Sequence, residues 1–133
     1  MEADKAFKAA ARARRRAALL RRIRNRGGRV CGLAVFEERS RRLSARGVRE
    51  IPLDAIKGTT EPNRAAQFDY EFRPAKLTRC RWLRVWTACH RGVTLPPISV
   101  IQVGDAYAIR DGHHRVSVAR ARGAATISAI VSA

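Results

Sequence analysis

The chain has 133 residues, with 28 Lys and Arg side chains against 11 Asp and Glu, so its formal net charge is +17. This length suits one domain with a modest core plus an extension. The charge predicts a polyanionic partner: nucleic acid, an anionic membrane surface or an acidic protein. No apolar run approaches the roughly 20 residues that span a bilayer, and no secretory signal is evident, which predicts a cytoplasmic protein.

The first part of the chain, residues 1–47, is predicted to be a basic helical extension. The first 50 residues hold 16 basic and 5 acidic side chains. Ala, Arg, Lys and Leu favour a helix over residues 2–26, and apolar spacing indicates a second short helix over residues 33–46.

The first of these helices has two interpretations. It is either a solvated helix that docks through its Ala and Leu face, or an arm that binds the phosphate backbone of DNA without sequence preference. We favour nucleic-acid contact. The candidate nucleic-acid-binding residues are Arg12, Arg14, Arg15, Arg16, Arg21 and Arg22.

From residue 48 onward the patterns predict an α+β domain with a small mixed sheet and flanking helices. The expected order is strand, loop, helix, strand, strand, helix, strand. The expected ranges are strand 48–52, loop 54–70, helix 76–91, strand 95–103, a strand ending at residue 109, a helix after residue 112, and strand 126–131.

The helix predicted over residues 76–91 has the clearest periodicity. Trp82, Val85, Trp86 and Cys89 recur at i, i+3, i+4 and i+7, so the tryptophans are expected in the core, together with the thiols of Cys89 and Cys80. The arginines of this helix are expected on its outer surface, and no zinc site is predicted.

A strand that turns at Gly112 into a helix organises the domain. Asp111 stands where an N-cap is expected, which places His113, His114 and Arg115 in the first helical turn. Helix starts are electropositive, and basic side chains there raise the potential further, so this turn predicts a bound phosphate. The alternative is that these are ordinary exposed residues at a helix start.

Residues 111–115 also resemble the phosphate-binding motif of the ParB/sulfiredoxin superfamily. The Asp-Gly-His form is closer to its free-serine kinases and to small ParB-like proteins of bacteria. Residues 48–56, Arg64 with Phe68–Asp69, and residues 95–100 resemble further segments of that family. The resemblance covers residues 48–133, where it implies a ParB/sulfiredoxin-like domain.

This resemblance implies a nucleoside triphosphate or diphosphate as cofactor, either CTP or ATP/ADP, with Mg²⁺ left open. Glu61 is the candidate catalytic base. Sulfinic-acid reduction is not expected, because His113 stands where sulfiredoxins have their cysteine. The candidate cofactor-binding residues are Arg64, Arg73, Asp111, Gly112, His113, His114 and Arg115.

Three functional classes follow. The first, which we favour, is a regulatory or partition-related nucleotide-binding module that associates with DNA through its basic arm. The second is a nucleotide-dependent enzyme: a small-molecule kinase of the free-serine type, a nucleotide hydrolase or a nuclease. The third is a basic interaction protein without nucleotide chemistry. A homodimer is left open.

Overall fold

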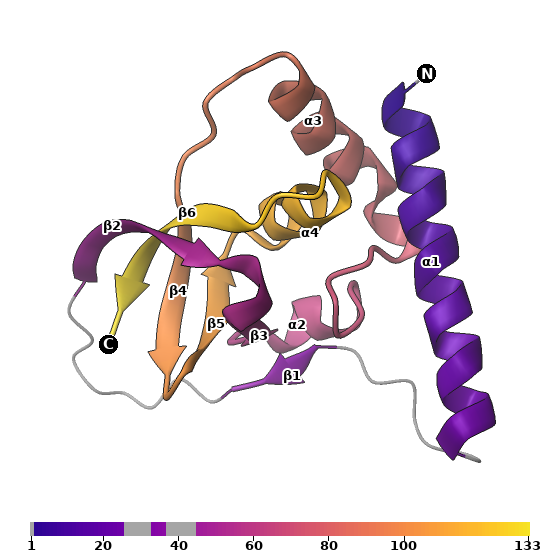
Figure 1. The fold of residues 1–133 in the computed structure, drawn as a ribbon, viewed down its shortest axis with the longest axis horizontal. Helices are drawn as coiled ribbons and strands as arrows, with labels where there is room; N and C mark the ends of the chain where they lie inside the picture. Colours follow the sequence, from indigo (N-terminus) through magenta and orange to yellow (C-terminus); the bar gives the residue numbers. More distant parts are fainter. Residues whose placement is uncertain (1, 26–32, 37–44) are drawn as a thin grey trace.

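The computed structural model describes residues 2–25, 33–36 and 45–133, without the side chains of residues 21–25, 45 and 46. Figure 1 shows a sheet with α3 and α4 lying together beside it and with α1 running along α3 at the edge of the molecule. The elements are α1 (Glu2–Asn25), β1 (Ala34–Val35), β2 (Ala45–Pro52), β3 (Ile56–Thr59), α2 (Pro62–Ala65), α3 (Arg79–His90), β4 (Ile98–Val103), β5 (Ala106–Asp111), α4 (His113–Ala121) and β6 (Thr126–Ser132), with 3₁₀ turns at Leu53–Ala55 and Lys76–Thr78.

The strands form one mixed sheet in the order β1-β3-β5-β4-β6-β2. β3 runs parallel to both β1 and β5, and β4 runs antiparallel to β5 and parallel to β6. β2 completes the sheet by pairing antiparallel with β6. The predicted α+β class, with a small mixed sheet and flanking helices, is therefore confirmed.

Two predicted elements are wrong. The segment predicted as a loop over residues 54–70 contains β3 and α2. In place of a helix over residues 33–46, the described residues form β1 and the start of β2, while residues 37–44 lie outside the description. Gly58 explains why residues 56–59 form a strand next to β1. A β-carbon at this position would lie 2.3 Å from the carbonyl oxygen of Ala34, so only glycine lets the two strands approach so closely. The same glycine had suggested a loop in the sequence.

The main core lies between the sheet, α4 and the segment after α2. Its apolar members come from every strand except β1, and Phe68 and Phe72 add the largest side chains. The fully buried side chains of this cluster include Ile51, Leu53, Ile56, Phe68, Phe72, Ile98, Val100, Ile109, Val116 and Val131.

A second, smaller core joins α1 to α3 and α4. Phe7 and Ala11 of α1 are buried against Trp82 and Val118. The rings of Phe7 and Trp82 meet edge-on, with centroids 5.5 Å apart, and Trp82 donates a hydrogen bond from Nε1 to Oγ of Ser117 at 2.8 Å. The basic helix α1 is thus docked on the rest of the protein through its first half.

The predicted core positions of α3 are confirmed only in part. Trp82 is fully buried, whereas Trp86 and Cys89 are half-buried. Cys80 is exposed, so the prediction of a core thiol there is wrong. It lies two positions before Trp82, which on a helix turns it away from the packed face. Every described helix is too short or too polar to cross a bilayer.

Candidate functional site

The parallel pairing of β3 with β5 brings two chain segments to one edge of the sheet. Thr59 pairs with Ile109, so both strands end together, and the residues that follow them meet there. The antiparallel strand β4 begins at the same edge, after the segment of Leu95 and Pro96. Ligand sites of α/β sheets collect at the carboxyl ends of parallel strands, where connections diverge.

Gly112 makes the turn from β5 into α4 possible. Its φ is +117°, and a β-carbon would lie 2.4 Å from Cγ2 of Ile98, so no side chain fits there. Gly112 is the N-cap of α4, which corrects the prediction that Asp111 holds that position; Asp111 is the last residue of β5. No side chain caps the helix, and its first turn contains no acidic residue. The amide groups of this turn therefore lack a partner from a capping side chain.

A cleft of about 500 Å³ opens at this helix start. Seven of the eight residues predicted to act in binding or catalysis line it, although they come from two separate segments, 61–64 and 111–115. They are Glu61, Arg64, Asp111, Gly112, His113, His114 and Arg115. The sequence analysis missed the other lining residues, which are Arg81, Arg84, Val85, Leu95, Pro96 and Arg110.

Positive charge dominates the lining of the cleft, where five guanidinium groups face two carboxylates. Arg81 and Arg84 are exposed on α3, although they were predicted to lie only on an outer surface. Their spacing with Val85 at i, i+3 and i+4 indicates a shared helix face, but the sequence does not say which neighbour that face meets. Arg64 is half-buried and donates from Nη1 to Oε1 of Gln67 at 3.1 Å.

Arg115 lines the cleft, yet its guanidinium is already engaged. Nη1 donates to the carbonyl oxygens of Pro96 at 2.6 Å and Pro97 at 3.0 Å, and Nη2 lies 3.2 Å from Oδ2 of Asp111. The side chain is only 16% exposed, while that of Asp111 is 82% exposed. Arg115 therefore fastens the segment before β4 to the start of α4.

The two histidines of the motif are uncharged at neutral pH. Burial, with Arg64 and His114 nearby, lowers the pKa of His113 from 6.5 to about 4. Burial, with Arg64 and Arg81 nearby, lowers the pKa of His114 to about 4. Both rings contact Phe68, the first nearly parallel and the second edge-on. The expectation that the histidines add positive charge is therefore wrong; the arginines supply it.

Thr59 is a further site residue that the sequence analysis missed. Its buried Oγ1 lies 2.6 Å from Nε2 of His113 and accepts the backbone N–H of Glu61 at 2.9 Å. It thereby connects the turn that carries Glu61 to the start of α4. A threonine next to two polar residues in an expected loop carries no sequence signal of this contact.

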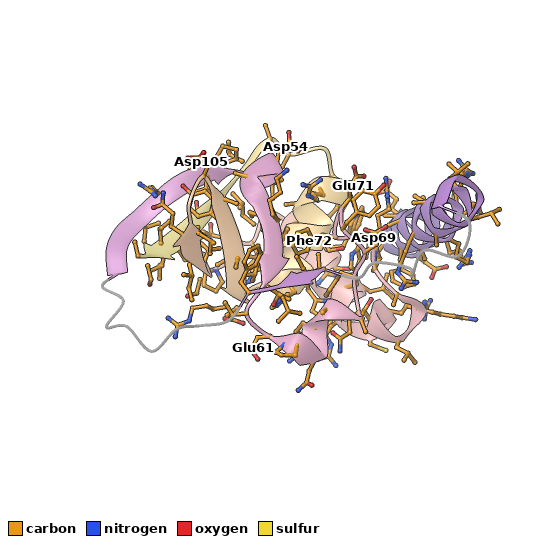
Figure 2. All side chains as sticks on the ribbon, turned by 90° about the horizontal axis from the view of Figure 1, so that it is seen from below. Asp54, Glu61, Asp69, Glu71, Phe72 and Asp105 are labelled. Carbon is orange, nitrogen blue, oxygen red and sulfur yellow. The ribbon has the colours of Figure 1, made fainter. Side chains whose placement is uncertain are left out.

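Arg73 does not line the cleft. Its guanidinium bonds Asp69 at 3.3 Å and also pairs with Glu71, within a turn that includes Phe72 at a φ of +60°. Figure 2 shows Asp69, Glu71 and Phe72 gathered in one region and Glu61 well apart from them. The structure therefore does not bring Arg73 to the cleft with the other predicted residues, because its neighbouring acids hold it elsewhere.

The predicted nucleic-acid-binding arginines all lie on α1. Arg12, Arg15 and Arg16 are exposed. Arg14 is half-buried on the docked side, and its Nε is buried without a hydrogen-bond partner. The side chains of Arg21 and Arg22 lie outside the description.

No group of three or more His, Cys, Asp or Glu side chains that could hold a metal ion occurs within residues 2–25, 33–36 and 45–133. This finding concerns sites built from protein side chains alone. Magnesium in nucleotide sites is commonly held by one or two carboxylates and the phosphates themselves.

A scan against models of protein families finds no match, and neither does a search of curated proteins. Among solved structures, sulfiredoxin from Arabidopsis thaliana matches with a TM-score of 0.46 and 22% sequence identity, over 64% of this chain and 83% of that chain. This likeness concerns the fold only. The function of the cleft is therefore inferred from its own contacts.

Proposed function

We propose that the cleft binds the phosphate groups of a nucleoside triphosphate or diphosphate, CTP or ATP/ADP, and that the protein associates with DNA through α1. The observation that carries the first part is the uncapped start of α4, which opens into a cleft rich in arginine. Backbone N–H groups at a helix start and guanidinium groups are both strong donors to phosphate oxygens.

Size and lining also support a nucleotide. The volume of about 500 Å³ lies within the ~300–1,000 Å³ that is typical of small-molecule pockets. Val85, Leu95 and Pro96 form an aliphatic part of the lining, against which a nucleoside can pack while its phosphates meet the arginines. Two carboxylates against five guanidiniums leave an excess of positive charge, which favours a polyphosphate over a single phosphate.

A thermal-shift and calorimetry panel of CTP, ATP, ADP and GTP, each with and without magnesium, tests this part. Arg81→Ala is compared with Arg91→Ala, because both remove an exposed arginine from the α3 region but only Arg81 lines the cleft. We expect Arg81→Ala to weaken binding by about 1.5–3 kcal/mol, the size of a lost charge-assisted hydrogen bond. Arg91→Ala should bind as the wild type does. An equal loss in both variants, or no stabilisation by any nucleotide, contradicts the proposal.

Association with DNA is supported by the way α1 divides its two faces. Phe7 and Ala11 dock on α3 and α4, which leaves Arg12, Arg15 and Arg16 exposed to solvent. A docked helix holds these charges on a defined surface, so contact with phosphates orders less chain than a free arm would.

The DNA test removes charge without removing the helix, because α1 covers Trp82. The triple variant Arg12→Gln, Arg15→Gln, Arg16→Gln is compared with Lys57→Gln, Lys76→Gln, Arg91→Gln, which removes three exposed charges elsewhere. Each lost phosphate contact makes the negative slope of log K against log salt shallower by about 0.9. We expect a slope that is less negative by about 3 for the first variant only. Equal slopes for both variants contradict a role for α1.

A phosphotransferase is the second candidate, and the position of Glu61 favours it. Its exposed side chain lines the cleft, and its backbone N–H is fixed by Thr59. A carboxylate held there can accept the proton of a hydroxyl substrate. Glu61→Gln should abolish turnover and leave nucleotide affinity nearly unchanged if the protein is an enzyme. If the wild-type protein shows no turnover, the phosphotransferase proposal fails and the nucleotide-binding function remains.

A further inference from the structure

The hydroxyl of Thr59 contacts two residues that line the cleft, Glu61 and His113. Thr59 is the last residue of β3 and is fully buried. Its Oγ1 lies close to three groups: the backbone N–H of Glu61 at 2.9 Å, Nε2 of His113 at 2.6 Å and the carbonyl oxygen of Ile109 at 3.2 Å. The amide can only donate, so the hydroxyl accepts there, and its single proton goes to one of the other two groups.

Distance decides which group receives that proton. O–H donors bond at about 2.5–3.0 Å and N–H donors at about 2.7–3.2 Å. The 2.6 Å contact with His113 therefore fits a hydroxyl donor better than an imidazole N–H donor, and the 3.2 Å contact with Ile109 is long for a hydroxyl. The carbonyl oxygen of Ile109 already accepts the backbone N–H of Thr60 at 2.9 Å, so it does not need the proton.

The state of the ring then follows. With Nε2 accepting from Thr59, the proton of a neutral imidazole sits on Nδ1. The low pKa of His113, about 4, keeps the ring neutral at physiological pH. Phe68 holds the ring plane, with centroids 6.2 Å apart and planes inclined by 19°. These contacts favour one orientation and one tautomer of the ring, and His113 lines the cleft.

We propose that Thr59 is a positioning residue, which fixes His113 as the Nδ1–H tautomer and thereby makes that nitrogen a neutral hydrogen-bond donor to phosphate oxygens in the cleft. The ligand part of this inference rests on the proposed nucleotide binding. The same hydroxyl accepts the backbone N–H of Glu61, so Thr59 also ties the backbone at Glu61 to the ring. One buried side chain thus coordinates two segments 54 residues apart.

The variants Thr59→Val and Thr59→Ser separate the hydroxyl from the shape of the side chain. Valine keeps the branched shape and lacks the donor, whereas serine keeps the donor and loses one methyl group. If Thr59 has a purely structural role, Thr59→Ser should reduce nucleotide affinity at least as much as Thr59→Val. If Thr59 fixes the tautomer of His113, Thr59→Val should lose the Nδ1–H tautomer and affinity, whereas Thr59→Ser should keep both.

The first readout is proton–nitrogen NMR of labelled histidine in the full-length, ligand-free protein at neutral pH. We expect His113 to carry its proton on Nδ1 in the wild type and in Thr59→Ser, and to lose this preference in Thr59→Val. A wild-type ring protonated on Nε2 overturns the inference, and this result needs no variant. An unchanged tautomer in folded Thr59→Val overturns it as well.

The second readout is affinity for the nucleotide that stabilises the wild type most. Loss of one neutral hydrogen-bond donor should weaken nucleotide affinity about two- to tenfold in Thr59→Val, whereas Thr59→Ser should bind nearly as tightly as the wild type. Unchanged affinity in Thr59→Val overturns the donor role of His113. If the Nδ1–H tautomer is found but no nucleotide binds, the NMR result supports the positioning role of Thr59, and the proposed nucleotide function fails.

Discussion

Gly112 lies so close to Ile98 that a β-carbon on it would come within 2.4 Å of Cγ2 and 2.7 Å of Cβ of that side chain. Ile98 begins β4 and is fully buried, so it has little room to move. The start of α4, and with it the proposed phosphate site, therefore depends on the absence of a side chain at one position. The positive φ at Gly112 imposes the same requirement independently.

We expect Gly112→Ala to destabilise the fold by about 3 kcal/mol or more, because overpacking and a left-handed backbone add together. Urea unfolding measures this loss. Gly123→Ala is the matched control: its φ is also positive, at +78°, but nothing lies within 4 Å of a β-carbon there. Gly123→Ala should lower the free energy of unfolding by about 1–2 kcal/mol, the cost of placing alanine in a left-handed backbone conformation. Similar losses in both variants would show that the contact with Ile98 is not limiting.

Docking of α1 is expected to contribute substantially to stability. Phe7→Ala removes a buried ring from its contact with Trp82 and should lower the free energy of unfolding by about 3 kcal/mol. Leu19→Ala on the same helix, where the side chain is 59% exposed, should change it by less than about 0.5 kcal/mol. Tryptophan fluorescence during denaturation follows both variants. Equal stabilities would mean that α1 does not dock in solution.

The depressed pKa of His113 predicts an acid-sensitive fold. The unfolded imidazole binds a proton near pH 6.5 and the folded one only near pH 4, so the unfolded state binds more protons between these values. Stability is therefore lost as the pH falls through this window, by an amount on the order of 3 kcal/mol for this group. His113→Gln should roughly halve the dependence of unfolding free energy on pH between 7 and about 5, because His114, whose pKa is also lowered to about 4, still contributes. An unchanged slope would contradict burial of a neutral ring.

Arg115 is expected to stabilise the fold mainly through the hydrogen bonds of its guanidinium to backbone carbonyl oxygens, and less through its charge. Lysine cannot bridge two carbonyl oxygens in this geometry, so Arg115→Lys should release the segment of Pro96 and Pro97 and cost about 1.5–3 kcal/mol of stability. Asp111→Asn removes only an exposed ion pair and should cost less than about 1 kcal/mol. Hydrogen exchange near Leu95 and thermal denaturation provide the measurements. Equal losses of stability in Arg115→Lys and Asp111→Asn would mean that Arg115 acts through its ion pair and not through its bonds to the two carbonyl oxygens.

The organising strand-turn-helix could be predicted because its signals are local. The apolar run of β5, the glycine at the turn and the helical spacing after it all fall within residues 106–123. The class of the fold followed from the order of such segments. Strand β3 could not be predicted, because its glycine and polar residues suit a strand only when β1 and β5 lie on either side of it.

The amino-acid sequence by itself determined a strongly basic chain, an α+β domain and a helix start that favours an anion. Only the tertiary structure decided which arginines face that helix start: Arg81 and Arg84 through the packing of α3, and not Arg73, whose acidic neighbours hold it in another turn. It also decided that His113 is neutral and meets Thr59. The physical reason is common to all of these: desolvation and hydrogen-bond partnership depend on segments far apart in sequence, which no local pattern records.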